Sequence, residues 1–169
     1  GDAVDDLAVD PAGQRLAIAA TSAGDQLRMV EIVTGKQLWS RANLGSERRL
    51  LAWRSDGSEL LVSGGSSGIQ IVSANTGKTV IALQGHLSAV TALDWSADGQ
   101  RILTASKDGA LRLWRRNATG AVGLTTSVRH CAWPCVATGG VVGLAFRTTQ
   151  GSEWLSVGAD GGVIGWRLP

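Results

Sequence analysis

The stretch that decides the fold is Gly85–Arg115, GHLSAVTALDWSADGQRILTASKDGALRLWR. Within it, Val90–Trp95 alternates between apolar and polar residues, as a half-buried strand does. Two further strands are predicted at Arg101–Ala105 and Ala110–Trp114, both rich in leucine or isoleucine. Asp-Gly pairs separate the three strands and suit tight reversals of the chain. The stretch therefore predicts a small antiparallel sheet, which needs a neighbouring sheet to be stable.

Weaker copies of this stretch lie before and after it. The first strand and its turn read LAVDPAG from Leu7, LAWRSDG from Leu51, LDWSADG from Leu93 and LAFRTTQG from Leu144. The second strands (QRLAIAA, SELLVSG, QRILTAS, SEWLSVG) and the third strands (LRMV, IQIV, LRLW, VIGW) follow in step. A fourth strand is predicted in the first three copies, as QLW, TVIAL and AVGL. The unit is thus four strands in roughly 42 to 44 residues, repeated nearly four times.

Composition restricts the class of protein. The chain has 169 residues, of which 44% are hydrophobic and 18% charged, which is typical of a globular protein. A net charge of +2 argues against a protein built mainly to neutralise phosphates. No apolar run approaches the roughly 18 residues of a membrane span. Two cysteines give no disulfide framework and favour an intracellular protein. We expect it to be cytoplasmic rather than nuclear. The chain starts without methionine or a visible signal peptide, so we expect a processed product or a piece of a longer chain.

The repeated unit resembles the WD-repeat family of β-propellers, and the resemblance runs from Ala3 to Leu168. It implies an all-β fold, a β-propeller of four-stranded antiparallel blades, with about four blades present in a single domain. The blade units are expected at residues 3–46, 47–84, 85–128 and 129–169. Rings of this family usually have six to eight blades. The resemblance therefore implies a larger or dimeric ring, completed by more of the same polypeptide or by a second copy.

The family resemblance also implies a hydrogen-bonded tetrad of His, Ser or Thr, Asp and Trp within a blade. The third unit matches it with His86, Thr104, Asp108 and Trp114. The fourth unit offers His130, Ser156, Asp160 and Trp166, with an insertion after the histidine. The first two units lack the histidine and carry Val30 and Val72 at the tryptophan position. We expect those two blades to pack without the polar network.

Partner contacts in this family fall on the top face, before and within the first strand and in the turn before the Asp. Mapped onto this chain, the resemblance gives Asp5, Glu47, Arg49, Ala89, Thr91, Lys107 and Val142. Their mixed character fits a protein partner better than a phosphate backbone. The insertion Cys131–Gly140 adds Trp133 beside a proline, a candidate binding anchor. The alternative is that Trp133 folds back over the neighbouring loop.

Four patterns that could carry chemistry have simpler interpretations. His130, Cys131 and Cys135 match no standard zinc spacing, so no metal is expected. Gly64–Gly68 has the G-x-S-x-G form of a hydrolase elbow but lies between two predicted strands, which indicates a hairpin turn. Asn75–Thr79 ends like a phosphate-binding loop without its first glycine. The sequon Asn117-Ala118-Thr119 coincides with a repeat turn.

The densest basic spots are Arg48-Arg49 and the set Arg112, Arg115 and Arg116, which we expect to be solvated. They lack the interleaved aromatics of a nucleic-acid site. The leading hypothesis is a non-catalytic protein–protein interaction scaffold that acts without a cofactor in a multiprotein complex. The alternatives are the ligand-sensing or regulatory end of a signalling ATPase, an RNA-binding or ribonucleoprotein scaffold, and an enzyme built on a propeller. The enzyme would need ionisable groups near the channel, where this chain has small or apolar residues.

Overall fold

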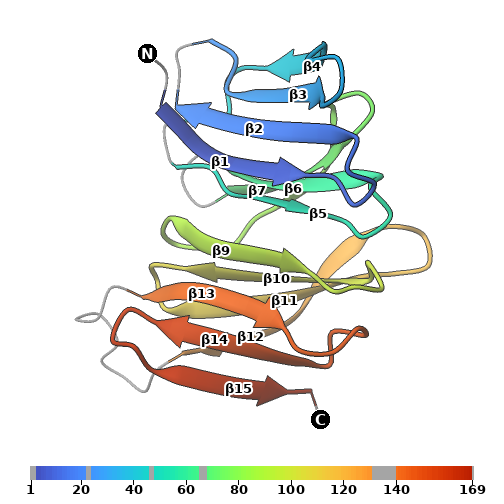
Figure 1. Ribbon diagram of the computed structural model, residues 1–169. Helices are drawn as coiled ribbons and strands as arrows, with labels where there is room; N and C mark the ends of the chain where they lie inside the picture. Colours follow the sequence, from blue (N-terminus) through green and yellow to red (C-terminus); the bar gives the residue numbers. More distant parts are fainter. Residues whose placement is uncertain (1–2, 22–23, 46–47, 65–67, 131–139, 169) are drawn as a thin grey trace. The chain divides into compact units, whose positions relative to one another are not determined.

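The computed structural model describes residues 3–21, 24–45, 48–64, 68–130 and 140–168. These residues form fifteen strands and no helix, and the strands make four antiparallel sheets (Figure 1). The all-β prediction and the propeller-blade prediction are therefore confirmed. The chain divides into two compact units, residues 1–84 and 85–169, each holding two sheets. Each sheet corresponds to one copy of the sequence repeat and is called a blade, numbered from first to fourth in chain order; 'unit' from here on means one of the two compact units.

The first unit contains two four-stranded sheets with the strands in chain order. The first sheet consists of β1 (Ala3–Val9), β2 (Arg15–Thr21), β3 (Leu27–Glu31) and β4 (Gln37–Arg41). The second consists of β5 (Leu51–Trp53), β6 (Glu59–Gly64), β7 (Gly68–Ser73) and β8 (Thr79–Leu83). Strands β1 and β5 are in contact, so the two sheets pack with their first strands adjacent.

The second unit repeats this arrangement. Its first sheet consists of β9 (Val90–Trp95), β10 (Arg101–Ser106), β11 (Ala110–Arg116) and β12 (Val122–Arg129). Its second sheet has three strands, β13 (Val141–Phe146), β14 (Glu153–Gly158) and β15 (Val163–Arg167). Here β9 contacts β13. Strand β12 is longer than the predicted AVGL and passes residue 128, the predicted blade boundary, by one residue.

The backbone repeats as regularly as the sequence does. The turn after the first strand of every blade contains a glycine with φ between 64° and 69°, at Gly13, Gly57, Gly99 and Gly151. Such left-handed conformations favour glycine. The third and fourth strands of the three complete sheets share a register shift at one equivalent position, for example between Ile71 and Val72. A shared bulge twists each sheet in the same way, so these sheets are copies of one blade.

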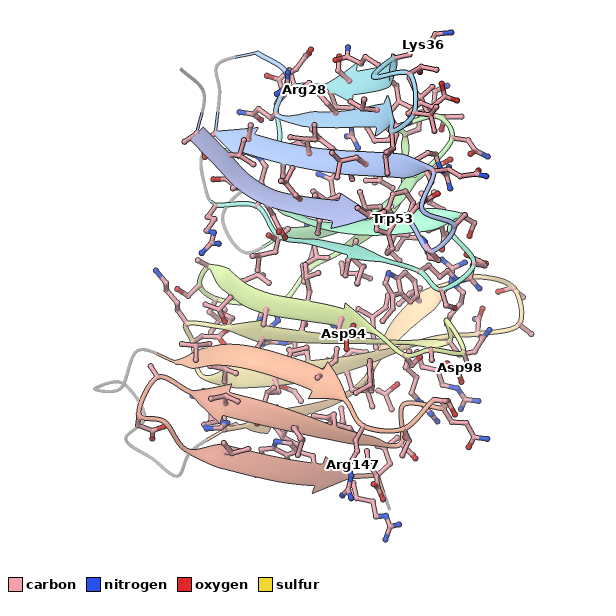
Figure 2. All side chains as sticks on the ribbon, viewed as in Figure 1. Arg28, Lys36, Trp53, Asp94, Asp98 and Arg147 are labelled. Atoms are coloured by element: carbon pink, nitrogen blue, oxygen red, sulfur yellow. The ribbon has the colours of Figure 1, made fainter. Side chains whose placement is uncertain are left out.

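Apolar side chains and tryptophans join the two sheets within each unit. In the first unit Trp53 lies between the sheets (Figure 2), and its indole Nε1 donates to the carbonyl oxygen of Ala8 at 2.9 Å. In the second unit Leu103, Leu113 and Trp154 form a buried cluster, against which Phe146 packs. Burial of these large side chains stabilises each unit and gives the turns a rigid base.

Candidate protein-interaction surface

A buried polar network ties the strands of the third blade together. The imidazole Nε2 of His86 lies 2.8 Å from the hydroxyl of Thr104, and the indole Nε1 of Trp114 donates to the same hydroxyl at 3.0 Å. All three residues are buried, with 0 to 5% of their surface exposed. Since buried polar groups are costly unless they are hydrogen-bonded, the shared hydroxyl fixes the start of the blade to β10 and β11.

The charged part of this network differs from the expected tetrad. The Arg112 guanidinium lies 2.5 Å from His86 Nδ1 and 3.5 Å from the Asp108 carboxylate. The same carboxylate is 3.5 Å from the imidazole, which is long for a direct hydrogen bond. Because a guanidinium can only donate, Nδ1 accepts and Nε2 carries the hydrogen that Thr104 receives. Arg112, which the sequence placed on a solvated face, is therefore half-buried in the network.

The same contacts set the protonation states. Burial, and then the charge of Arg112, lower the pKa of His86 to about 4, so the imidazole is neutral at pH 7. Burial alone would raise the pKa of Asp108, but hydrogen bonds from the backbone N–H groups of Leu87 and Ala110 lower it. These two bonds, of 2.8 and 2.9 Å, make Asp108 an acceptor for the loop before β9 and for the start of β11. Its main contacts are thus with the backbone.

The fourth blade has a related network. Ser156 accepts the indole N–H of Trp166 at 2.7 Å, and its hydroxyl is 2.8 Å from Nδ1 of His130. The carboxylate of Asp160 accepts the backbone N–H of Gly162 at 2.9 Å. A Cβ on Gly158 would come within 2.6 Å of both the Asp160 carboxylate and the His130 ring. Glycine at this position therefore allows the histidine and the aspartate to approach the same point of β14.

The second blade fills the equivalent space with apolar side chains. Leu44 stands nine residues before Trp53, as His86 stands nine before Trp95. Leu44, Val62 and Val72 belong to one buried cluster in the first unit, where the third blade has His86, Thr104 and Trp114. This blade packs around an apolar cluster instead of a polar one.

Four of the predicted contact residues gather at one end of the second unit. The carbonyl of Ala89 accepts the backbone N–H of Lys107 at 3.0 Å, and the Thr91 hydroxyl donates to the carbonyl of Val141, next to Val142. Lys107 and Val142 are exposed. The structure adds Leu87, which is 84% exposed and bonded through its N–H to Asp108. We call Leu87, Ala89, Thr91, Lys107 and Val142 the turn surface.

In the first unit two of the predicted contacts, Asp5 and Arg49, have a structural role. The Arg49 side chain is fully buried and donates to the Asp5 carboxylate at 3.0 Å and to the carbonyl of Ala20 at 3.1 Å. A partner could not touch this guanidinium without displacing the chain around it, so the structure argues against Arg49 as a surface contact. Arg48 beside it is exposed, as predicted. Glu47 and Trp133 lie outside the described residues, as do Cys131 and Cys135.

The described parts of three of the four patterns with simple interpretations lie at the ends of paired strands or in the turns between them. Gly64 and Gly68 are the ends of the paired strands β6 and β7. Thr76-Gly77-Lys78 connects β7 to β8, and the side-chain oxygen of Asn117 accepts three hydrogen bonds within the turn between β11 and β12. Across the described part of the chain, no three His, Cys, Asp or Glu residues gather as metal ligands would. The same residues include no helix long and apolar enough to span a membrane.

Comparison with known families agrees with this geometry. The family model "WD domain, G-beta repeat" matches residues 77–115, which include the polar network of the third blade up to Trp114. The model "Anaphase-promoting complex subunit 4 WD40 domain" matches residues 26–88. The chain belongs to the WD-repeat family. Both matches to this WD-repeat protein lie in the part of the chain whose repeats are most regular.

Known proteins resemble this WD-repeat chain over different lengths. "WD repeat domain 54" of Rattus norvegicus is 27% identical over 96 residues, which are 57% of this chain and 28% of that protein. The solved "Structure of U3-55K" superposes with a TM-score of 0.79 at 20% identity, over 99% of this chain and 50% of that chain. The "Crystal Structure of Mitotic Checkpoint Complex" gives 0.77 at 17% identity, over 98% and 48%. The chain thus spans about half of these solved propellers, and the likeness to them concerns the fold.

Proposed function

We propose that this WD-repeat chain is a non-catalytic scaffold that binds other proteins during assembly of a multiprotein complex. The observation that carries the proposal is the turn surface of the second unit. There the exposed Leu87 and Lys107 flank Asp108, whose carboxylate is bonded to backbone on both sides. A rigid surface that combines apolar and charged groups is suited to a protein partner, because little entropy is lost when it binds.

The state of the histidines supports a non-catalytic role. His86 is buried, bonded to Thr104 and held neutral by its low pKa. His130 is buried and close to the Ser156 hydroxyl. Both imidazoles are thus engaged in holding blades together. The exposed residues of the turn surface, by contrast, make no such internal contacts through their side chains within the part of the chain that the structure describes, and are available to a protein partner.

The proposal is tested by capture of partners with matched variants. Tagged chain is incubated with an extract of its source cells, and the captured proteins are quantified by mass spectrometry. Leu87→Asp should lower the recovery of specific proteins at least fivefold. Val33→Asp is the matched control, because Val33 is 90% exposed and lies in a turn of the first unit. Equal recovery with both variants and the unaltered chain would argue against the turn surface as the binding site.

We further propose that additional blades cover the exposed strands of the two units. In β1, Val4, Leu7 and Val9 are each more than 50% exposed, and Val163 in β15 is 62% exposed. Apolar strand surfaces of this kind are normally covered by a partner. They suit blades from the same polypeptide or from a second copy. Native mass spectrometry of this chain alone separates these two sources: a dimer is expected if a second copy covers the strands, whereas a stable monomer would contradict a second copy and favour blades of the same polypeptide.

A further inference from the structure

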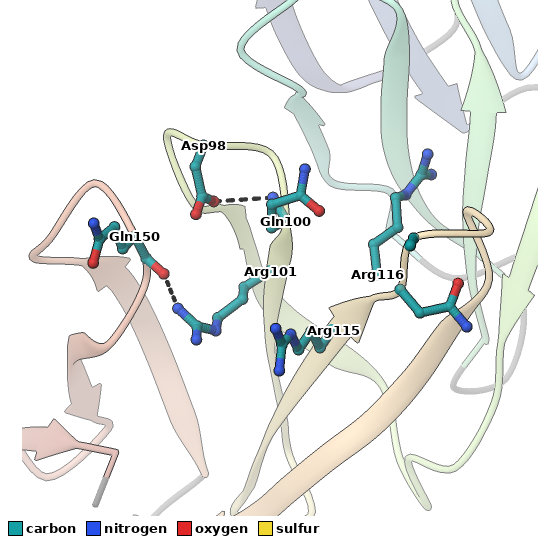
Figure 3. Close-up of a pocket in the computed structure, with 8 residues that line it drawn as sticks. Asp98, Gln100, Arg101, Arg115, Arg116 and Gln150 are labelled. Atoms are coloured by element: carbon teal, nitrogen blue, oxygen red, sulfur yellow. Dashed lines mark hydrogen bonds between the residues drawn. The ribbon is translucent and has the colours of Figure 1, made fainter.

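One cavity of the second unit combines three arginines with three amide side chains. It has a volume of about 690 Å³ and lies at the end of the unit that holds the β9–β10, β11–β12 and β13–β14 turns (Figure 3). Its polar lining residues are Asp98, Gln100, Arg101, Arg115, Arg116, Asn117 and Gln150. This volume is within the usual range for ligand pockets, roughly 300 to 1,000 Å³.

The charges in this cavity are unusual among the four blades. In each blade the first residue of the second strand pairs with a residue of the third strand, directly opposite it in the antiparallel ladder. The four pairs are Arg15–Glu31, Glu59–Ser73, Arg101–Arg115 and Glu153–Arg167. Of these pairs in the described strands, only the third places like charges opposite one another. Like charges at this position destabilise a sheet, so the third blade keeps an arrangement that its own folding does not favour.

The first blade shows how the same arginine is neutralised elsewhere. Arg15 donates from Nε to the buried Asp10 carboxylate at 2.9 Å and from Nη2 to the carbonyl of Gly57 in the next blade at 2.7 Å. Arg101 makes the corresponding contact with the next blade, through the carbonyl of Gln150 (Figure 3). At the repeat position where the first blade has Asp10, the third blade has Ser96, which carries no charge to neutralise Arg101.

The one carboxylate in the cavity is held by other groups. Oδ1 of Asp98 accepts hydrogen bonds from the Ser96 hydroxyl at 2.6 Å and from the backbone N–H of Gln100 at 3.0 Å. The Arg116 guanidinium lies over the ring of Trp95, 5.9 Å from its centroid. Arg115 is exposed. The cavity therefore presents positive charge to solvent, with Arg101 and Arg115 side by side in its wall.

We propose that this cavity binds an acidic peptide segment of a partner protein, with carboxylates placed on Arg101 and Arg115. Guanidinium groups bind carboxylates through paired, charge-assisted hydrogen bonds. The amides of Gln100, Asn117 and Gln150 supply donors and acceptors that suit a peptide backbone. An anion between the two arginines also relieves their repulsion. Trp95 is only 5% exposed, so the cavity offers no open ring for stacking nucleobases.

The test uses the whole chain and a fluorescein-labelled peptide of alternating glutamate and glycine, with the glutamine counterpart as the control peptide. Fluorescence anisotropy at low salt should show saturable binding of the glutamate peptide, at least about tenfold tighter than the control, because charge-assisted bonds are lost with the carboxylates. Binding should weaken as sodium chloride is added. Equal binding of the two peptides, or none at millimolar peptide, would overturn the proposal.

Variants at Arg115 separate recognition from folding. Arg115→Gln should weaken binding about tenfold, and Arg115→Glu, which copies the Arg15–Glu31 pair, should abolish it. Both variants should melt at the same temperature as the unaltered chain or higher, because the like-charge pair is removed. Lys36→Gln is the matched control, because Lys36 lies in an exposed turn of the first unit (Figure 2). The Lys36→Gln variant should bind the peptide as tightly as the unaltered chain does. If Arg115→Gln binds as Lys36→Gln does, the site is wrong.

Two competitors decide the class of ligand. Pyrophosphate and single-stranded RNA should displace the labelled peptide only at concentrations well above that of unlabelled glutamate peptide. Tighter binding by either competitor would contradict a peptide ligand. The inference rests on the proposed scaffold function only in that its ligand is a protein. Its failure would leave the turn surface, which is tested through Leu87, unaffected.

Discussion

The two units of this WD-repeat chain build the same blade with different interior chemistry. In the second unit a Thr104 hydroxyl joins His86 and Trp114, whereas in the first unit Val62 stands in that place among Leu44 and Val72. The arginine that begins the second strand of a blade also differs between the units. In the first blade Arg15 is neutralised by Asp10, whereas in the third blade Arg101 lies opposite another arginine. One backbone therefore accepts either a polar or an apolar interior, and either a neutralised or an unneutralised arginine.

The largest effect on stability is expected from exchanging the polar residue of the third blade's interior with its apolar counterpart in the second blade. Thr104→Val leaves the ring N–H groups of His86 and Trp114 buried without an acceptor. It should lower the free energy of unfolding by about 3 kcal/mol, since each stranded donor costs roughly 1 to 3 kcal/mol. The reverse change, Val62→Thr, buries one hydroxyl among apolar side chains and should cost about 1 to 2 kcal/mol. Urea denaturation measures both, and a smaller loss for Thr104→Val than for Val62→Thr would contradict the network.

A second comparison concerns the two arginines that reach the next blade. Arg15→Gln leaves the buried Asp10 carboxylate without its cation and should cost about 2 kcal/mol. Arg101→Gln loses a hydrogen bond to Gln150 but also removes the repulsion from Arg115, so its net effect should be within about 0.5 kcal/mol of zero. Thermal unfolding of the two variants tests this difference. Equal destabilisation by the two variants would show that neither the partner Asp10 nor the repulsion from Arg115 changes what these arginines contribute to stability.

The smallest expected difference concerns two equivalent glycines in the turns before the fourth strands. Gly77 and Gly120 both have positive φ, of 68° and 85°, which alanine tolerates at a cost of about 1 kcal/mol. A Cβ on Gly77 would also come 2.7 Å from a ring carbon of Trp39, whereas nothing lies within 4 Å at Gly120. Gly77→Ala should therefore cost about 1 kcal/mol more than Gly120→Ala. Differential scanning calorimetry would contradict this if the two variants melt together.

Much of the fold could be predicted because each copy of the repeat can be recognised from its own short stretch of sequence. Turn glycines, alternating strands and a spacing of about 42 residues sufficed to place the blades. Leu44 could have been recognised as the counterpart of His86 from its offset to Trp53. The position of Arg112 beside His86 could not be predicted, because it depends on which way a long side chain turns. The arginine cavity was missed because Arg101, Arg115 and Gln150 come from three separate strands or turns in two blades.

The most direct test of the contrast between the units is the pH dependence of their local stability. The folded pKa of His86, about 4, is below its ordinary value of 6.5, so its neutral form contributes stability that is complete above pH 6.5 and lost as the pH falls toward 4. Hydrogen exchange, corrected for intrinsic rates, should show β10 and β11 losing protection about twentyfold between pH 7 and pH 5. The apolar second blade should change little, and His86→Leu should remove the effect from the third. Equal loss in β6 and β10, or an unchanged response in His86→Leu, would contradict the account.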